Sequence, residues 1–252
     1  METGNRIVLI TGGSRGIGRA IALRLAQEKP EHVVISYNMN HPAARKTVED
    51  LKAMGVGASA IPLDVSRPEL LEELFDGVKK RFGRLDVFVH NAARASFRPV
   101  LELSLRAWEK MLDLNATAFL KASQLAAGLM RGNGGGHIVG LSSLGSIRAV
   151  PQYAGLGASK AAIESLTRYL GVELAPLGIR VNAVSAGFVD TESMRLNPEF
   201  DALAAQVKAR TPAGRVATPE DVAGVVAFLC SPDARWIYGQ TLIADGGVSL
   251  VF

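Results

Sequence analysis

A strand, a glycine-rich turn and a helix follow one another without a break at the start of the chain. Residues 6–11 read RIVLIT, residues 12–18 read GGSRGIG, and the residues after them are apolar at helical spacing. Backbone N–H groups at such a helix N-terminus bind anions, and glycines let a ligand approach the backbone closely. The stretch therefore predicts a pyrophosphate-binding loop, although glycines in this place can also simply form a tight turn.

Apolar strands alternate with amphipathic helices along the rest of the chain. Strands are predicted at 32–37, 58–63, 85–90, 137–143 and 179–185, with a last strand and turn at 241–247, and helices at 43–54, 69–82, 105–130, 155–174 and 219–229. Repeated strand–helix–strand units build parallel, doubly wound sheets with helices on both faces, so we expect an α/β fold. No linker or repeat interrupts the pattern, which predicts one domain over 1–252. Residues from about 188 to 217 fit the pattern poorly and are expected to form a flap over a site.

The composition argues against several classes of protein. Of the 252 residues 48% are hydrophobic, and 28 basic against 24 acidic residues give a net charge of +4 without any basic run. Nucleic-acid binding is therefore not expected, whereas an acidic partner would suit the surface. The single cysteine, Cys230, lies in the apolar run VVAFLC and is expected in the core. It cannot form a disulfide within the chain, and no leader or membrane-spanning run is visible, so we expect a cytoplasmic protein. No cluster of His, Cys and acidic residues has metal-binding spacing, so no metal is expected.

Three polar residues stand around the fifth strand and the helix that follows it. Ser143 ends the strand, Tyr153 lies near the start of the helix, and Lys160 lies two turns further on. A hydroxyl, a phenol and an ammonium at the mouth of a parallel sheet suggest proton transfer beside a bound ligand. The alternative is that Ser143 caps a turn, Tyr153 packs against the fold, and Lys160 is a solvated helix lysine.

Two asparagines and an aspartate form a second group of candidates. Asn91, with Ala92 and Ala93, follows the fourth strand, where it can brace a loop against a flat ligand or form an ordinary turn. Asn115 interrupts an apolar helix face, which is unfavourable unless its amide bonds water or a backbone carbonyl at a local kink. A solvated asparagine is the alternative there. Asp64 can accept from an adenine amino group or cap the next turn.

Together these motifs resemble the short-chain dehydrogenase/reductase family over essentially the full chain. The matching stretches are TGGSRGIG at 11–18, Asp64, HNAA at 90–93, Asn115, Ser143, a tyrosine with Lys160, and SAGFVDT at 185–191. The resemblance implies a Rossmann-type, mostly parallel seven-stranded sheet, a nicotinamide cofactor and a homotetramer. It also implies a set of cofactor-binding residues, namely Gly12, Ser14, Arg15, Gly16, Ile17, Gly18, Tyr37, Asn38, Asp64, Val65, Asn91, Ala92, Ala93, Lys160, Ala186, Gly187, Val189 and Thr191.

The end of the second strand bears on the choice of cofactor. An acidic residue about 20 positions after the glycine loop often binds the ribose 2′-hydroxyl of NAD. Here Ser36, Tyr37 and Asn38 offer no carboxylate that would repel a 2′-phosphate, and Arg15 can pair with one. The sequence therefore favours NADPH over NADH, although Arg15 alone would read as an exposed loop arginine.

The spacing of the catalytic pair departs from the general family pattern. Most members place the tyrosine four residues before the lysine, where this chain has Leu156; Tyr153 lies seven before Lys160. Seven helical residues span about 10 Å of axis, so the phenol is expected to enter from the start of the helix. This spacing resembles the NADPH-dependent type III form of enoyl-acyl-carrier-protein reductase. HNAA in place of NNAG is a further departure, in a loop where small residues suffice.

That resemblance implies reduction of the C=C bond of trans-2-enoyl thioesters on acyl carrier protein, in fatty-acid elongation. Tyr153 and Lys160 would be the catalytic pair and Asn115 an accompanying residue, while Ser143 would touch the substrate oxygen or only line the pocket. An NADPH-dependent reductase of 3-ketoacyl thioesters or other carbonyls is the alternative, and a non-catalytic nicotinamide-binding sensor is a further one. Four basic residues flank the flap and are expected to form a rim for acidic acyl carrier protein, with ordinary solvated surface charge as the alternative: Arg195, Lys208, Arg210 and Arg215.

Overall fold

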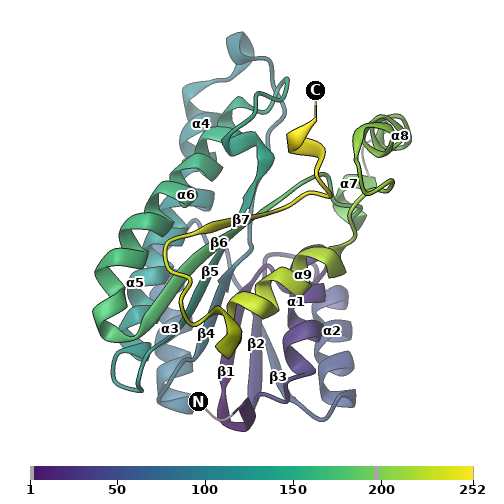
Figure 1. Cartoon of the computed structure of the whole chain (residues 1–252). Helices are drawn as coiled ribbons and strands as arrows, with labels where there is room; N and C mark the ends of the chain where they lie inside the picture. The colour runs from purple at the N-terminus through teal and green to yellow at the C-terminus, as the bar shows by residue number, and fades with distance from the viewer. Residues whose placement is uncertain (1–2, 196–198, 252) are drawn as a thin grey trace.

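Seven parallel strands form the centre of the computed structural model, which describes residues 3–195 and 199–251. In these residues the strands are β1 (Ile7–Thr11), β2 (His32–Tyr37), β3 (Gly57–Pro62), β4 (Val87–His90), β5 (Gly136–Ser143), β6 (Ile179–Ala186) and β7 (Thr241–Ala244). Their order in the sheet is β3-β2-β1-β4-β5-β6-β7, with every neighbouring pair parallel (Figure 1). The predicted doubly wound α/β sheet is thereby confirmed.

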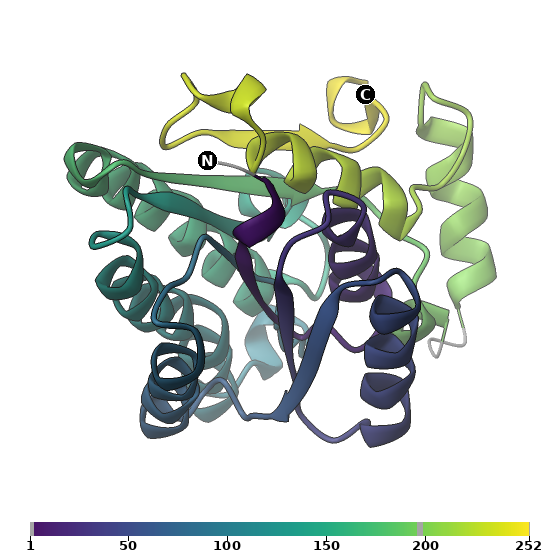
Figure 2. The same cartoon turned by 90° about the horizontal axis from the view of Figure 1, so that it is seen from below.

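Helices cover both faces of the sheet, as Figures 1 and 2 show. One face carries α1 (Gly16–Ala26), α2 (His41–Ala53) and α9 (Pro219–Leu229); the other carries α3 (Pro68–Phe82), α4 (Leu105–Leu112), α5 (Ala118–Met130) and α6 (Ala154–Leu174). Both faces of the strands are consequently buried, which explains why β1, β2 and β4 read as continuous apolar runs. Cys230 lies in the core beneath α9, as predicted, and burial raises the pKa of its thiol to about 12.

Two stretches differ in detail from the sequence-based expectation. The predicted 105–130 helix is broken by a π-helical turn at Asp113–Thr117, which separates α4 from α5. The flap region contains α7 (Glu192–Arg195) and α8 (Phe200–Arg210). The Phe188 and Phe200 rings stack there with centroids 5.8 Å apart, and an isolated parallel bridge pairs Val189 with Ala217. No helix in the described part of the chain is long and apolar enough to cross a membrane.

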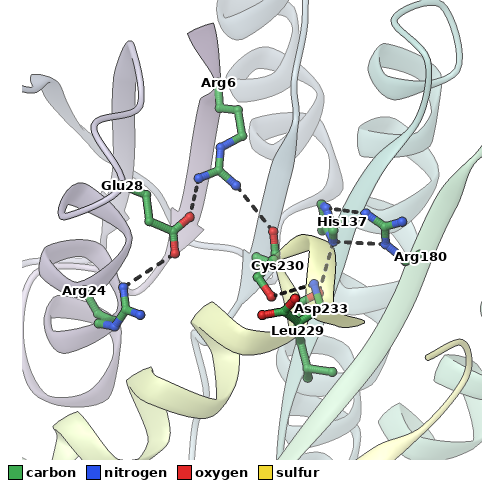
Figure 3. A network of polar contacts seen from close by, with 9 residues as sticks. Arg6, Arg24, Glu28, His137, Arg180, Leu229, Cys230 and Asp233 are labelled. Atoms are coloured by element: carbon green, nitrogen blue, oxygen red, sulfur yellow. Dashed lines mark hydrogen bonds and ion pairs between the residues drawn. The ribbon is translucent and has the colours of Figure 1, made fainter. Parts of the chain in front are cut away.

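A network of polar contacts links β1, β5, β6 and the end of α9 at the edge of the sheet where the strands begin (Figure 3). Arg6 pairs with Glu28 and donates to the Cys230 carbonyl at 3.3 Å. His137 Nδ1 lies 3.1 Å from the Leu229 carbonyl, and Arg180 Nη2 lies 2.8 Å from His137 Nε2. A neutral imidazole with its hydrogen on Nδ1 satisfies both contacts, and burial lowers the pKa of His137 to about 3. This network serves the fold, because the candidate site lies at the other edge.

Candidate active site

The predicted cofactor-binding residues outside the helices lie at the carboxyl ends of the strands or in the loops that follow them. Parallel strands end on one edge, so loops far apart in sequence meet there. The strand order reverses between β1 and β4, which is where such sheets bind ligands. The groups are residues 12–18 in the turn after β1 and the start of α1, Tyr37 at the end of β2 with Asn38 after it, Asp64 and Val65 after β3, 91–93 after β4, and Ala186 at the end of β6 with 187–191 after it.

The glycine loop after β1 has the conformation that an anion-binding turn requires. Gly12 and Gly16 have φ angles of +67° and +53°, which favour glycine. A Cβ on Gly18 would lie 2.2 Å from the Gly12 carbonyl oxygen, so α1 can approach β1 this closely only with glycine. Arg15 caps α1 without any side-chain hydrogen bond to the helix. The first N–H groups of this 11-residue helix are therefore open to a ligand, and the loop fits a dinucleotide pyrophosphate.

Asn91 braces this loop from the neighbouring strand. Its Nδ2 donates to the Thr11 carbonyl at 3.1 Å and to the Gly12 carbonyl at 2.9 Å. The Thr11 hydroxyl in turn accepts from the backbone N–H groups of Asn91 and Ala92, at 3.1 and 3.2 Å. The predicted bracing role is confirmed, and it fixes the place of the small residues that follow β4.

His90 extends the bracing to the π-helical turn, a connection that the sequence analysis missed. Its Nδ1 lies 3.5 Å from Thr11 Oγ1 and its Nε2 lies 3.2 Å from the Asn115 carbonyl. Since a carbonyl only accepts, the hydrogen belongs on Nε2 and Thr11 donates to Nδ1. All three residues are fully buried. Burial, followed by the charge of Lys160, lowers the pKa of His90 to about 3, so the ring is neutral. A histidine ending the apolar run LDVFVH was the signal in the sequence.

Both Oδ1 and Nδ2 of the Asn115 side chain are hydrogen-bonded, as expected for an asparagine at a local kink in a helix. Its Oδ1 accepts from the Arg94 N–H at 3.0 Å, and its Nδ2 donates to the Arg94 carbonyl at 3.1 Å. Nδ2 also donates to Ser159 Oγ at 2.9 Å, on the residue before Lys160. The solvated alternative is wrong, because Asn115 is fully buried. The side chain thus joins the loop after β4 to α6.

Tyr153 and Ser143 meet at the end of β5. Tyr153 is the residue that caps α6, and its hydroxyl donates to Ser143 Oγ at 3.2 Å. Burial raises the pKa of the phenol. The hydrogen bond with Ser143 lowers this pKa, but by less than burial raises it. The phenol is therefore protonated at neutral pH and can donate a hydrogen bond. The Phe97 ring lies 5.9 Å from the Tyr153 ring, so an apolar side chain borders the phenol.

Lys160 is buried rather than solvated, which excludes the alternative for this residue. It is 5% exposed, and its Nζ donates to the Leu141 carbonyl of β5 at 2.6 Å. Burial lowers the pKa of the ammonium to about 8, so the group is still largely charged at pH 7. Two of its three hydrogens remain for other acceptors. Leu156, one turn before it, is buried as well.

The remaining predicted residues lie at the edges of the site. Asp64 Oδ1 accepts from the Ser66 N–H at 3.0 Å and from its hydroxyl at 2.7 Å, which is the turn-capping role. The Tyr37 hydroxyl lies 2.8 Å from His41 Nδ1. Neither contact occupies the whole side chain, so both residues keep polar atoms for a ligand.

The predicted basic rim is partly neutralised within the chain. Arg195 makes two hydrogen bonds to the Asp190 carboxylate, at 2.6 and 2.7 Å. Arg215 does the same with Asp221, at 2.6 and 2.7 Å, at the start of α9. Lys208 and Arg210 are exposed in the last turn of α8. The rim is therefore less positive than the sequence alone suggests, because two of its arginines have carboxylate partners.

Comparisons with known proteins agree with this site and fold. A family model described as Enoyl-(Acyl carrier protein) reductase matches residues 12–249. The 1-cyclohexenylcarbonyl-CoA reductase of Streptomyces collinus is 43% identical over 248 residues, covering 98% of this chain and 88% of that protein. The 3beta-hydroxysteroid dehydrogenase 1 of Eggerthella lenta is 35% identical over 249 residues, covering 97% and 94%. The crystal structure of an acetoin dehydrogenase from Salmonella typhimurium superimposes with a TM-score of 0.88 at 30% identity, covering 98% of each chain.

The fold and the site define a nicotinamide-dependent oxidoreductase with a Rossmann-type sheet. The chain belongs to the short-chain dehydrogenase/reductase family.

Proposed function

We propose that the protein reduces the C=C bond of α,β-unsaturated acyl thioesters with NADPH. The observation that carries the proposal is the place of the phenol: Tyr153 reaches Ser143 from the entrance of α6, while Leu156 lies one turn before Lys160. We expect a phenol at the start of the helix to contact a substrate oxygen that is not bonded to the carbon receiving the hydride. An enoyl thioester has this arrangement, because its oxygen is on the carbonyl carbon and the hydride goes to the β-carbon. The similarity to a family described as enoyl reductases, and to a relative named as a CoA reductase, supports it.

The chemistry requires one hydride and one proton. The β-carbon of the thioester would take up the hydride that a reduced nicotinamide supplies when bound. The π-electrons then shift towards the thioester oxygen, where Tyr153 donates a hydrogen bond to the developing negative charge. A proton from water would then add to the α-carbon, so that the products are the saturated thioester and the oxidised cofactor. Lys160 would bind the nicotinamide ribose hydroxyls with the two hydrogens that Leu141 leaves, and its charge favours the anionic state.

The preference for NADPH rests on the end of β2 and on Arg15. The exposed Arg15 stands in the glycine loop, and no carboxylate occupies positions 36–38. Replacing Arg15 with alanine is expected to raise the KM for NADPH at least tenfold and to leave that for NADH within twofold, because only NADPH has the 2′-phosphate. An equal change with both cofactors, or none, would contradict the NADPH assignment.

The carrier of the acyl group is the second part of the proposal. Acyl carrier protein is the carrier we propose, with Lys208 and Arg210 as the two cations of the rim that have no carboxylate partner among the described residues. The test compares the crotonyl group on acyl carrier protein, on coenzyme A and on pantetheine. Carrier docking predicts a KM at least tenfold lower for the protein-bound substrate and loss of that advantage in Lys208→Glu/Arg210→Glu. An equal or lower KM for the coenzyme A thioester would identify coenzyme A as the carrier instead.

Carbonyl reduction is the alternative, and the contact between Tyr153 and Ser143 favours it because two hydroxyls can polarise one carbonyl. NADPH oxidation is therefore followed at 340 nm with crotonyl and acetoacetyl thioesters separately. Oxidation with crotonyl alone supports enoyl reduction, and oxidation with acetoacetyl alone supports the alternative. Tight NADPH binding without oxidation by either substrate would point to a non-catalytic sensor.

A further inference from the structure

A buried carboxylate on α6 holds the strand end that carries Ser143. Glu164 is 8% exposed, and its Oε1 accepts from Ser142 Oγ at 2.6 Å and from Ser146 Oγ at 2.6 Å. Nothing in the proposed reaction uses this group. Carboxylates are seldom buried without a partner, and here the partners are two neutral hydroxyls rather than a cation.

The two hydroxyls come from either side of Ser143. Ser142 is the preceding residue of β5, and Ser146 ends the short turn at Leu144–Ser146. Ser146 Oγ also lies 2.7 Å from the Ser143 carbonyl, so its single hydrogen is shared between that carbonyl and the carboxylate. Glu164 therefore fixes the backbone on both sides of the residue to which Tyr153 donates.

The same turn supports the Tyr153 ring. A Cβ on Gly145 would lie 2.4 Å from Tyr153 Cε1, and a Cβ on Gly157 would lie 2.5 Å from the Gly145 carbonyl. The turn is thus confined between the ring and α6, without room for a methyl group on either glycine. A displacement of the turn would move Ser143 Oγ and the surface on which the phenol rests together.

We infer that Glu164 is the positioning residue of the Ser143–Tyr153 pair: it holds the turn after β5 so that the phenol faces the reacting oxygen. Glu164 lies one turn beyond Lys160 on α6, but the described contact of the ammonium is the Leu141 carbonyl. The carboxylate therefore acts through the two serines rather than as a partner of Lys160.

Catalysis gives the first test, and this arm rests on the proposed function. Glu164→Gln keeps an acceptor oxygen at this place and is expected to retain kcat within threefold with crotonyl thioester. Glu164→Leu and Ser146→Ala lose the link and are expected to lower kcat at least tenfold and threefold, respectively, with the KM for NADPH within twofold. Glu173→Gln, an exposed glutamate on the same helix, is the matched control and should leave both constants unchanged. Unchanged kcat in both Glu164→Leu and Ser146→Ala would overturn the inference.

A second test needs no turnover. The chain has four tyrosines, so protein labelled with 3-fluorotyrosine should give four ¹⁹F resonances, with Tyr153 assigned by its loss in Tyr153→Phe. The Tyr153 resonance should move in Glu164→Leu and Ser146→Ala but not in Glu164→Gln or Glu173→Gln. If the wild type reduces neither thioester and the resonance still moves, the proposed function fails and the positioning role stands. If the resonance stays in place in both, the positioning role is overturned whatever the activity; should Glu164→Leu not fold, Ser146→Ala decides.

Discussion

The Tyr153 hydroxyl donates a hydrogen bond to Ser143 Oγ over a distance of 3.2 Å. Tyr153 is the residue that caps α6, so it lies just before the helix that holds Lys160. The phenol and the ammonium therefore reach the site from different structural elements. The turn after β5 and the start of α6 set the phenol, whereas the β5 backbone holds Lys160 through the Leu141 carbonyl. This division lets the two groups act on different atoms, the phenol on a substrate oxygen and the ammonium on the cofactor.

Loss of the phenol is expected to remove most of the activity. Tyr153→Phe keeps the ring and deletes the donor, and removal of a donor to a developing oxyanion costs about 100-fold or more in kcat. Steady-state rates with crotonyl thioester give this value, and NADPH binding measured by fluorescence should stay unchanged. A loss under about tenfold, ~1.4 kcal/mol, would argue against a central role for the phenol.

Lys160 predicts a pH dependence of cofactor use. Its pKa of about 8 leaves the ammonium charged at pH 7 and neutral above the pKa. Because the charged form is the better hydrogen-bond donor and attracts the anionic cofactor, kcat/KM for NADPH should fall as the pH rises through about 8. Lys160→Met should give a low, flat profile between pH 7 and 9. A wild-type profile that stays flat over this range would contradict the assignment.

Asn115 should contribute to both stability and activity. Asn115→Leu keeps the volume but leaves the Arg94 N–H and carbonyl and the Ser159 hydroxyl without this partner. We expect a loss of about 2–4 kcal/mol in the free energy of unfolding, measured with urea, and a fall in kcat. Asn133→Leu, which removes one hydrogen bond to the Leu129 carbonyl at the end of α5, is the control for a simple amide loss. Equal effects of the two changes would show that Asn115 has no special role.

Buried histidines should make the fold sensitive to acid. Burial is the main cause that lowers the pKa of His32 to about 4 and those of His90 and His137 to about 3. In the unfolded chain the histidines take up protons near pH 6.5. Their contribution to the free energy of unfolding is therefore complete above that pH, and it is lost as the pH falls towards the pKa values of the folded state. Each of these histidines should lower the free energy of unfolding at pH 5 by about 2 kcal/mol relative to its value at pH 7.5.

Urea unfolding of His137→Asn at the two pH values checks this expectation. The variant should show a pH dependence smaller by about 2 kcal/mol than that of the wild type. His41→Asn, at an exposed position, is the control for the effect of the substitution itself. An identical pH dependence in all three proteins would contradict the burial argument for His137.

Periodicity and turn chemistry were enough to predict the sheet and the cofactor loop. The strands are apolar because both faces are covered, and glycines mark the turn after β1, so these features are local in sequence. Asn115 could be singled out as an unfavourable helix residue, but its partners Arg94 and Ser159 lie 21 and 44 positions away. No local pattern identifies such partners.

Charges and buried polar residues were harder to interpret from sequence. The ion pairs of Arg195 with Asp190 and of Arg215 with Asp221 join residues five and six apart, outside ordinary helical spacing, so the rim looked more positive than it is. Glu164 could not be singled out from the sequence, because its serine partners are contributed by β5 and the turn after it. The helices within 188–217 depend on packing around Phe188 and Phe200 rather than on a clear apolar period.

A competition experiment tests the central claim most directly. Equal concentrations of crotonyl and acetoacetyl thioesters are mixed with NADPH that carries deuterium at the transferred position, and the products are resolved by mass spectrometry. The product ratio gives the ratio of the two kcat/KM values. We predict labelled butyryl thioester in at least tenfold excess, with deuterium at the β-carbon. Predominance of labelled 3-hydroxybutyryl thioester would contradict the claim and identify a carbonyl reductase.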